Sequence, residues 1–397
     1  MQGLRDLEKW RKFSYLCAHC RCCSAADYHT LGEYMQICPS GTYFGFESYF
    51  SSGKMEVIRG LIEGLISKPS EKLLEIVYVC TLCGACEKNC EEFTLLGEDS
   101  GGLTHIFEDA RAFLVESGWG PLEKHKEFAS SIRVNHNPYL EPHEKRESWT
   151  EKSSLRKGSL VYFTGCTSSY RQKEVAKATV KALEAMEEKF VIMGSEEWCC
   201  GSPLLRTGQI DQITELAEHN VKALKEIGAK KVITSCAGCY RTLKSEYPKI
   251  LGAQPDFEVV HSSQFFAGAL DKNKLKLTKD VDATVTYHDP CHLGRHMGVY
   301  DEPRNLLKKI PDLKLVEMPR SRQNSWCCGA GGGVKSAFPD FATSTAVERL
   351  REAEAIGVKK IVSMCPFCKH NLTDAAKLLK NKFEVYDVVE LLSKAIG

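Results

Sequence analysis

The chain has 397 residues and a formal net charge of +1, with 43% hydrophobic and 26% charged residues. This composition is typical of an ordinary globular protein with two or three domains, and the charge balance argues against nucleic acid as a partner. No apolar run reaches the ~18 residues that a membrane span needs, and the N-terminal Met-Gln-Gly-Leu-Arg-Asp lacks an apolar signal core. We therefore expect a cytoplasmic protein that reaches a membrane only peripherally, through a partner subunit.

The sequence contains 19 cysteines, which is an odd number. Disulfide frameworks belong mainly to small secreted domains, and an export signal is not apparent here. Thiolates that bind a soft metal therefore explain the cysteines better than disulfides do.

Residues 1–150 are expected to form a helical domain with two ferredoxin-type cysteine runs. The run over residues 80–90 has the complete C-x2-C-x2-C-x3-C spacing of bacterial [4Fe–4S] ferredoxins. The run over residues 17–23 has C-x2-C-x2-C, and its Cys-Pro is displaced to Cys38 by an insertion. Between the runs, residues 54–79 carry apolar side chains at helical spacing, so we expect the clusters to lie between helix ends.

The two runs are expected to exchange their last ligands, because the fourth cysteine of such a run usually binds the other cluster. In the first run Cys22 competes with Cys23 as the third ligand, and the spacing from Cys20 favours Cys23. Zinc is the alternative, since C-x-x-C pairs also bind zinc, but a zinc ion takes only four ligands. One predicted cubane cluster is bound by Cys38, Cys80, Cys83 and Cys86, and the other by Cys17, Cys20, Cys23 and Cys90.

Residues 141–159 are polar and charged without an apolar period, which indicates a linker. After it, residues 160–270 and 284–397 form an internal repeat in which short β-rich runs and helical patterns alternate. Strand–helix–strand order predicts βαβ units and a parallel sheet in each repeat. The expected fold is therefore α+β and multidomain: a helical ferredoxin-type domain over 1–150, then two α/β domains over 151–275 and 276–397. The paired β-rich runs are 160–166 with 284–291, 230–236 with 359–365, and 257–260 with 383–386.

Each repeat carries five cysteines in the same order: one alone, an adjacent pair within Trp-Cys-Cys-Gly, and a final C-x-x-C. The lone cysteine and the first of the C-x-x-C each end a predicted strand, and ligands in parallel α/β folds gather at the carboxyl ends of strands. Five thiolates exceed the four ligands of a zinc ion or a cubane cluster, so they indicate a larger or distorted iron–sulfur assembly. The two predicted metal-binding sets are Cys166, Cys199, Cys200, Cys236 and Cys239, and Cys291, Cys327, Cys328, Cys365 and Cys368.

Glycines and histidines accompany these cysteines. Gly201 and Gly329 follow the two adjacent pairs, where a glycine lets the backbone pass close to sulfide. Gly331 belongs to Gly-Ala-Gly-Gly-Gly, which lacks the last glycine of a dinucleotide-binding fingerprint, so close approach to a cluster is the favoured interpretation. His288 and His292 flank Cys291 and are candidate proton carriers or ligands, with hydrogen bonding or surface exposure as the alternative.

The doubled five-cysteine motif resembles the cysteine-rich CCG domain of heterodisulfide reductases. With two ferredoxin-type runs in front, the layout is similar to the D subunit in that family. The resemblance implies two cubane clusters in the N-terminal domain and two noncubane [4Fe–4S] clusters, one per repeat, with a disulfide substrate between them. The residues predicted to act in catalysis are Cys199, Cys200, Cys327, Cys328, His288 and His292.

The predicted function is an iron–sulfur oxidoreductase subunit that passes electrons through the cubane clusters to the paired repeats, where a disulfide of the coenzyme M–coenzyme B type is reduced. The sequence contains no flavin or haem motif, so a flavoprotein or a membrane cytochrome b is the expected redox partner. The alternative is a non-catalytic electron-transfer subunit of a flavin-linked 2-hydroxy-acid dehydrogenase (lactate or glycolate) or acyl-CoA dehydrogenase. A structural zinc protein is the third interpretation.

Overall fold

The computed structural model describes residues 7–26, 32–90, 102–150 and 157–396. The chain divides into two compact units, and these cut across the three domains expected over 1–150, 151–275 and 276–397, so that three-domain division stays a prediction. Within the described ranges, no helix combines the length and the apolar character needed to cross a bilayer. Unit 1 comprises Met1–Glu127, Pro203–Asp211 and Pro319–Arg349, and unit 2 comprises Phe128–Ser202, Gln212–Met318 and Leu350–Gly397.

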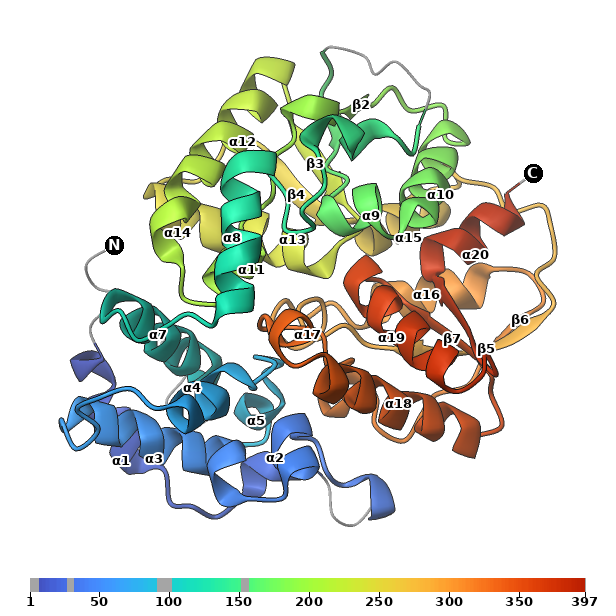
Figure 1. Cartoon of the computed structure of the whole chain (residues 1–397). Helices are drawn as coiled ribbons and strands as arrows, with labels where there is room; N and C mark the ends of the chain where they lie inside the picture. The colour runs from blue at the N-terminus through green and yellow to red at the C-terminus, as the bar shows by residue number, and fades with distance from the viewer. Residues whose placement is uncertain (1–6, 27–31, 91–101, 151–156, 397) are drawn as a thin grey trace. The chain divides into compact units, whose positions relative to one another are not determined.

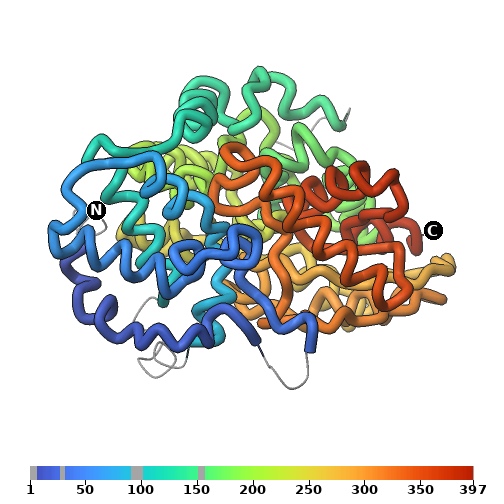
Figure 2. The backbone as a smooth tube through the Cα atoms, turned by 60° about the horizontal axis from the view of Figure 1, so that its bottom comes forward, coloured from blue at the N-terminus to red at the C-terminus, as the bar shows by residue number. Residues whose placement is uncertain are grey.

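Unit 1 is helical where it is described, and its core lies between three helices: α3 (Ser51–Ile62), α4 (Glu71–Tyr78) and α7 (Gly102–Glu116) (Figure 1). The helical pattern predicted over residues 54–79 is confirmed as two helices. The first ends before Gly64, which has φ +72°, and Ser70 caps the N-terminus of α4 by accepting a hydrogen bond from Leu73 N. Figure 2 follows the backbone of these N-terminal helices in blue. The shorter elements are η2 (Glu8–Trp10), α1 (Arg11–Leu16), η3 (Cys22–Ser24), η4 (Gly32–Tyr34), α2 (Pro39–Phe44), η5 (Glu47–Tyr49), α5 (Ala85–Lys88), η11 (Arg322–Asn324) and α17 (Val334–Ala337).

Unit 2 contains two four-stranded parallel sheets with the same topology, which confirms the predicted repeat of α/β structure. The first sheet has the order β2-β1-β3-β4 and the second β6-β5-β7-β8. In each sheet the chain adds strands first to one side of the first central strand and then to the other side. Open α/β sheets bind ligands at this switch point, between the two central strands. The strands are β1 (Leu160–Tyr162), β2 (Val191–Ile192), β3 (Lys231–Thr234), β4 (Glu258–His261), β5 (Ala283–His288), β6 (Leu313–Leu315), β7 (Lys360–Ser363) and β8 (Glu384–Asp387).

Helices cover these sheets as the sequence pattern predicts. In α12 (Ile213–Ile227) the apolar face is buried, and Gly228 ends the helix in the left-handed conformation with φ +89°. The other helices of unit 2 are α9 (Cys166–Tyr170), α10 (Lys173–Glu184), α13 (Ala237–Arg241), α14 (Tyr247–Leu251), α15 (Ser262–Asp271), α16 (Asp301–Lys309), α19 (Pro366–Leu378) and α20 (Val388–Ala395), with the shorter turns η7 (His143–Glu147), η8 (Gly194–Glu196) and the π turn η10 (Thr242–Glu246). Four elements cross from one unit to the other: α8 (Glu123–Asn135), α11 (Ser202–Leu205), η9 (Ile210–Gln212) and α18 (Pro339–Ala355).

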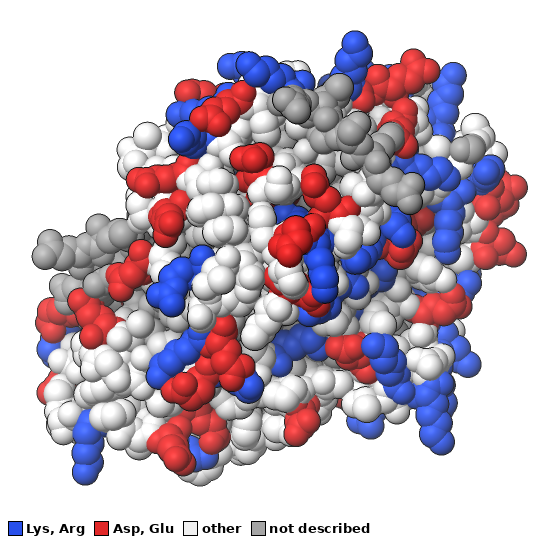
Figure 3. Space-filling view, turned by 45° about the horizontal axis from the view of Figure 1, so that its top comes forward, with Lys and Arg blue, Asp and Glu red and all other residues white. Residues whose placement is uncertain are grey.

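Residues 141–150 of the linker predicted over residues 141–159 are more closely packed than a linker would be. Residues 141–150 include η7, in which Arg146 is only 2% exposed, and Trp149 is also buried. The sequence of this segment shows no helical period of apolar residues, because only the charged side chain of Arg146 and the ring of Trp149 are buried. Residues 151–156 of the predicted linker and 27–31 of the insertion before Cys38 lie outside the described residues. On the face drawn in Figure 3, basic and acidic side chains are interspersed, as a net charge of +1 would suggest.

Candidate metal centres

Unit 1 holds a pocket that four cysteines line, and we call it the inner pocket. Cys80 follows the end of α4, Cys86 lies in α5, and the loop between them turns through Leu82 at φ +54° and Gly84 at φ +71°. The left-handed residues curl the loop so that successive cysteines face one space. The four cysteines are Cys38, Cys80, Cys83 and Cys86, the set that ferredoxin spacing assigns to one cubane cluster.

A second pocket in unit 1 is also lined by cysteines, and we call it the outer pocket. Its cysteines are Cys17, Cys20, Cys23 and Cys90, again one predicted ligand set, and Cys22 is not among its lining residues. Cys20 is exposed, whereas Cys83 of the inner pocket is buried. The assignment of all eight cysteines as iron ligands stays a prediction.

The thiols in these pockets need a compensating cation to ionise. Burial raises the pKa of the Cys23 thiol to about 12, and burial also raises the pKa of Cys38 and that of Cys86. At Cys38 the charge of Lys54 acts in the opposite direction and lowers the pKa. Iron bound by these sulfurs would supply the missing positive charge, so the donor set fits a soft metal or an iron–sulfur cluster.

Unit 2 brings together the five cysteines of the first repeat, all of them buried. Cys166 begins α9 after strand β1, Cys236 caps α13 after strand β3, and Cys239 lies in α13. The backbone approaches closely here, because a Cβ atom on Gly165 would lie 3.1 Å from Cys239 Sγ. Gly165 also has φ +78°, a conformation that favours glycine. The predicted placement of these cysteines after the central strands is confirmed.

Hydrogen bonds among the thiols of this site set their charges. Cys200 accepts from Cys199 and Cys239, and these bonds hold the pKa of Cys200 well below its usual value. Its neighbour Cys199 has a pKa well above the usual value, chiefly through its bonds to Cys166 and Cys200. The pKa of Cys166 is lowered, chiefly by its hydrogen bond with Cys199 and then by the positive charge of Arg146. The site thus holds these sulfurs in contact with one another, and the charge of Arg146 favours the ionised form of Cys166.

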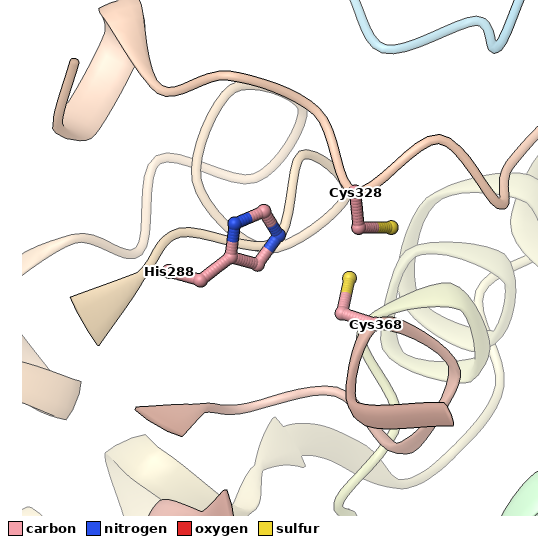
Figure 4. Close-up of side chains that lie close together, drawn as sticks. All are labelled: His288, Cys328 and Cys368. Atoms are coloured by element: carbon pink, nitrogen blue, oxygen red, sulfur yellow. The ribbon is translucent and has the colours of Figure 1, made fainter. Parts of the chain in front are cut away.

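The second repeat places part of its predicted site in unit 2. His288 ends strand β5, and one of its ring nitrogens lies within 4.8 Å of Cys368 Sγ in α19. Figure 4 shows both side chains directed into the same space; Cys328, which the figure also labels, belongs to unit 1 together with Cys327. The imidazole is 1% exposed, and its Nδ1 atom has no hydrogen-bond partner among the described residues.

The two repeats meet within unit 2 at cysteines. Cys236 of the first repeat is hydrogen-bonded to Cys239 and to Cys365 of the second repeat. The bond to Cys239 lowers the pKa of Cys236, but the bond to Cys365 and burial together raise that pKa well above the usual value. His292 also faces the first repeat, because a Cβ atom on Gly238 would lie 3.7 Å from Cys236 Sγ and 4.0 Å from His292 Nδ1. Thiols from both predicted sites and one candidate histidine are therefore neighbours.

Comparison with known proteins agrees with this arrangement. The family model of the cysteine-rich domain CCG matches residues 160–244 and 285–373. A Methanosarcina mazei protein, named as the D subunit of dihydromethanophenazine:CoB–CoM heterodisulfide reductase, is 45% identical over 333 residues, which cover 82% of this chain and 80% of that protein. The protein of the same name in Methanosarcina acetivorans is 40% identical over 392 residues, which cover 96% of this chain and 93% of that protein. The chain belongs to the family of heterodisulfide reductase D subunits.

As a member of the heterodisulfide reductase D family, the chain is an iron–sulfur oxidoreductase component and one subunit of a larger enzyme. EtfAB:quinone oxidoreductase of Syntrophomonas wolfei is also similar, at 30% identity over 81% of this chain and 47% of that protein. Among solved structures, a hypothetical protein from Helicobacter pylori has a TM-score of 0.59 and 10% identity, and it covers 92% of this chain and 72% of that chain. That likeness concerns the fold alone.

Two residues beside the first repeat of this heterodisulfide reductase D family member were missed in the sequence. The guanidinium of Arg146 donates to Cys166 Sγ at 3.3 Å and to Glu197 Oε1 at 2.6 Å. Glu197 is 1% exposed and also accepts from the backbone N–H groups of Thr164 at 2.7 Å and Gly165 at 2.9 Å. The only sequence signal was the position of Glu197, directly before Trp198-Cys-Cys; the charged run around Arg146 carried none.

The tryptophan of the first Trp-Cys-Cys-Gly motif is held between two imidazoles. Trp198 stacks on His136 with ring centroids 3.7 Å apart and on His219 with centroids 3.6 Å apart. Burial lowers the pKa of His136 to about 4, so this ring is neutral at pH 7. Asn220 accepts from Trp198 N at 3.1 Å and donates to Cys199 O at 3.2 Å, which fixes the backbone beside the cysteine pair.

The predicted glycines take two roles. Gly201 N–H donates to Cys199 Sγ at 3.4 Å and Gly329 N–H donates to Cys327 Sγ at 3.3 Å, the same bond in both repeats. Such bonds stabilise thiolate charge and tune metal centres. Gly331 lies against the loop of the inner pocket, because a Cβ atom there would come 2.7 Å from Thr81 O.

Proposed function

We propose that the chain binds four [4Fe–4S] clusters and reduces a small-molecule disulfide at the two Cys-Cys-Gly repeats. Two cubane clusters would be bound in the inner and outer pockets, and two noncubane clusters by the five cysteines of each repeat. The observation that carries the proposal is the contact of Cys236 with Cys365, which makes thiols of the two repeats neighbours within unit 2. A disulfide has two sulfur atoms, and a paired site can receive one at each side.

The bound clusters would supply one-electron transfer and iron atoms with affinity for sulfur. The reaction breaks one S–S bond and consumes two electrons, which come from the partner, and two protons, leaving two thiols. His288 and His292 are the side chains that we propose to deliver protons. Both border the paired site, His288 beside Cys368 and His292 beside Gly238. The bonds from the backbone at Gly201 and Gly329 would hold the adjacent cysteine pairs in place.

The substrate that we propose is a disulfide of the coenzyme M–coenzyme B type, in line with the names of the Methanosarcina relatives. The partner that we propose is a flavoprotein or a membrane cytochrome b, which would hold this chain at the membrane surface when the cytochrome is used. Electrons from that partner would enter through the pockets of unit 1.

The test is the metal content and spectrum of protein purified without oxygen. Four clusters correspond to about 16 iron atoms per chain. Reduced protein should convert the mixed disulfide of coenzyme M and coenzyme B to two thiols, and the paramagnetic signal of a repeat should shift when a thiol is added. Full zinc occupancy with little iron would reject the cluster assignment. Full iron with a spectrum indifferent to thiols and disulfides would reject the disulfide reduction alone.

A second candidate function is electron transfer without catalysis, for a flavin-linked 2-hydroxy-acid or acyl-CoA dehydrogenase. It is favoured by the similarity to EtfAB:quinone oxidoreductase. Under this alternative the protein would be reduced by an electron-transferring flavoprotein at a useful rate, and it would not turn over any disulfide. Parallel assays with both electron donors separate the two functions.

A further inference from the structure

Two cationic side chains of unit 1 are buried at the inner pocket. Lys54, in α3, lines the pocket together with its four cysteines and is 3% exposed. Arg111, in α7, is fully buried, and its Nη2 atom donates to the carbonyl oxygen of Cys80 at 2.6 Å. Lys54 therefore lines the pocket itself, and Arg111 is bonded to the backbone of one of its predicted ligands.

Neither cation makes an ion pair within the described ranges. Lys54 Nζ donates to Ser40 Oγ at 2.9 Å and to the carbonyl oxygen of Tyr49. Every hydrogen bond of Arg111 also goes to a backbone carbonyl. A buried charge with only neutral partners is costly unless a negative group lies close by. For Arg111 the nearby Glu108 carboxylate supplies part of that charge, although it is paired with Arg206, and a cluster with four thiolate ligands would add further negative charge beside both cations.

The outer pocket is different. Its basic residues are His19 and Arg21, whose side chains are 40% and 49% exposed. Each is paired with a carboxylate: His19 with Glu56, and Arg21 with Glu47 at 3.3 Å. Solvent and Glu47 screen the charge of Arg21, and Arg59, whose charge lowers the pKa of Cys17, is paired with Glu56, so a cluster in the outer pocket would feel a weaker positive field.

Reduction of a cluster adds one negative charge to it, and a nearby buried cation stabilises the added charge. We propose that Lys54 and Arg111 give the cubane of the inner pocket a higher reduction potential than that of the outer pocket, so that electrons move inward. This inference rests on the proposed function in one respect, the presence of a cubane cluster in each pocket. Electrons would then enter at the solvent-exposed side, near Cys20, and collect at the inner pocket beside Cys80.

The test is a redox titration of the anaerobic holoprotein, followed by electron paramagnetic resonance. Cys20→Ser and Cys83→Ser variants identify which signal belongs to the outer and which to the inner pocket. Lys54→Gln keeps a hydrogen-bond donor but removes the charge. At a fixed solution potential it should lower the ratio of reduced to oxidised inner cluster at least tenfold, which corresponds to about 59 mV for one electron. The outer signal should move far less. Lys12→Gln is the matched control, since it removes the same charge from an exposed position.

Arg111 provides a second arm. Arg111→Lys retains the charge and should leave the inner potential close to that of the parent, whereas Arg111→Gln should lower it. If Arg111→Gln does not fold, Lys54→Gln decides the question alone. A parent protein in which the outer cluster has the higher potential overturns the proposal, as does a Lys54→Gln shift no larger than that of Lys12→Gln. Absence of two cubane signals from the parent would instead reject the proposed cluster content.

Discussion

Removal of the Glu197 carboxylate should strongly destabilise the first repeat. The Glu197→Ala variant leaves Arg146 charged and buried without its carboxylate, a change that typically costs about 3–5 kcal/mol. The backbone N–H groups of Thr164 and Gly165 lose their acceptor at the same time, and each buried unsatisfied donor costs about 1–3 kcal/mol. Because the losses share one site, we expect a total near the upper end of the first range, about 5 kcal/mol.

The assay is anaerobic urea unfolding of the holoprotein, followed by tryptophan fluorescence, for Glu197→Ala, Arg146→Met and the double variant. The double variant removes both charges, so it should cost clearly less than the sum of the two single changes. Glu141→Ala is the control, since Glu141 forms a partly exposed ion pair with Arg171 and its loss should cost at most about 1 kcal/mol. Single effects that add within about 0.5 kcal/mol would refute the coupling of the pair.

Further predictions concern other residues. Cys83→Ser should remove one cubane signal and leave the signals of the repeats intact; loss of all signals would contradict independent sites. Cys22→Ala should keep the full iron content while Cys23→Ala loses one cubane, and the reverse result would shift the ligand assignment by one residue. Gly331→Ala should destabilise by about 1–3 kcal/mol, because its Cβ would meet a carbonyl of the inner-pocket loop, whereas Gly268→Ala, with open space around it, should be neutral or stabilising. Three histidines have pKa values lowered to about 4, chiefly by burial, below the unfolded value of about 6.5, and His136 is only partly buried. The two fully buried rings should therefore each lower stability by up to about 1.4 kcal/mol per pH unit as the pH falls from 6.5 to 4. A stability flat over that range would contradict these shifts. The histidines are His125, His136 and His261.

The repeat was predictable because its information is local. Strand β3 is recognisable as a short β-rich run and helix α12 by the helical period of its apolar residues, and Gly228 marks the helix end. The cysteine spacing likewise predicts which thiols should share a site, and the two pockets of unit 1 are lined by the same groups of four. Whether iron is bound by those groups remains a prediction.

The buried charges could not be predicted, because their partners lie far away along the chain. Arg111 donates a hydrogen bond to the carbonyl oxygen of Gly332, 221 positions away in the sequence. Glu197 accepts one from Arg146, which is 51 positions away. A charged residue in a polar run has the same local pattern whether it is exposed or buried. Only the tertiary fold separates Arg146, which is 2% exposed, from an ordinary solvated arginine.

The carbonyl partners of Arg111 also bear on how the protein is made. Its acceptors include Val77 and Cys80 upstream, Arg206, and Gly332, all within unit 1. At a synthesis rate of about 5–20 residues per second, the 221 residues that separate Arg111 from Gly332 take on the order of 10–45 seconds to emerge. During that interval the ribosome presents the cysteines of both pockets without the last segments that complete their surroundings. Delivery of iron and sulfide to the nascent chain would therefore meet an unfinished site, and a fragment expressed only to residue 150 would keep the eight cysteines of the two pockets but never acquire this anchor.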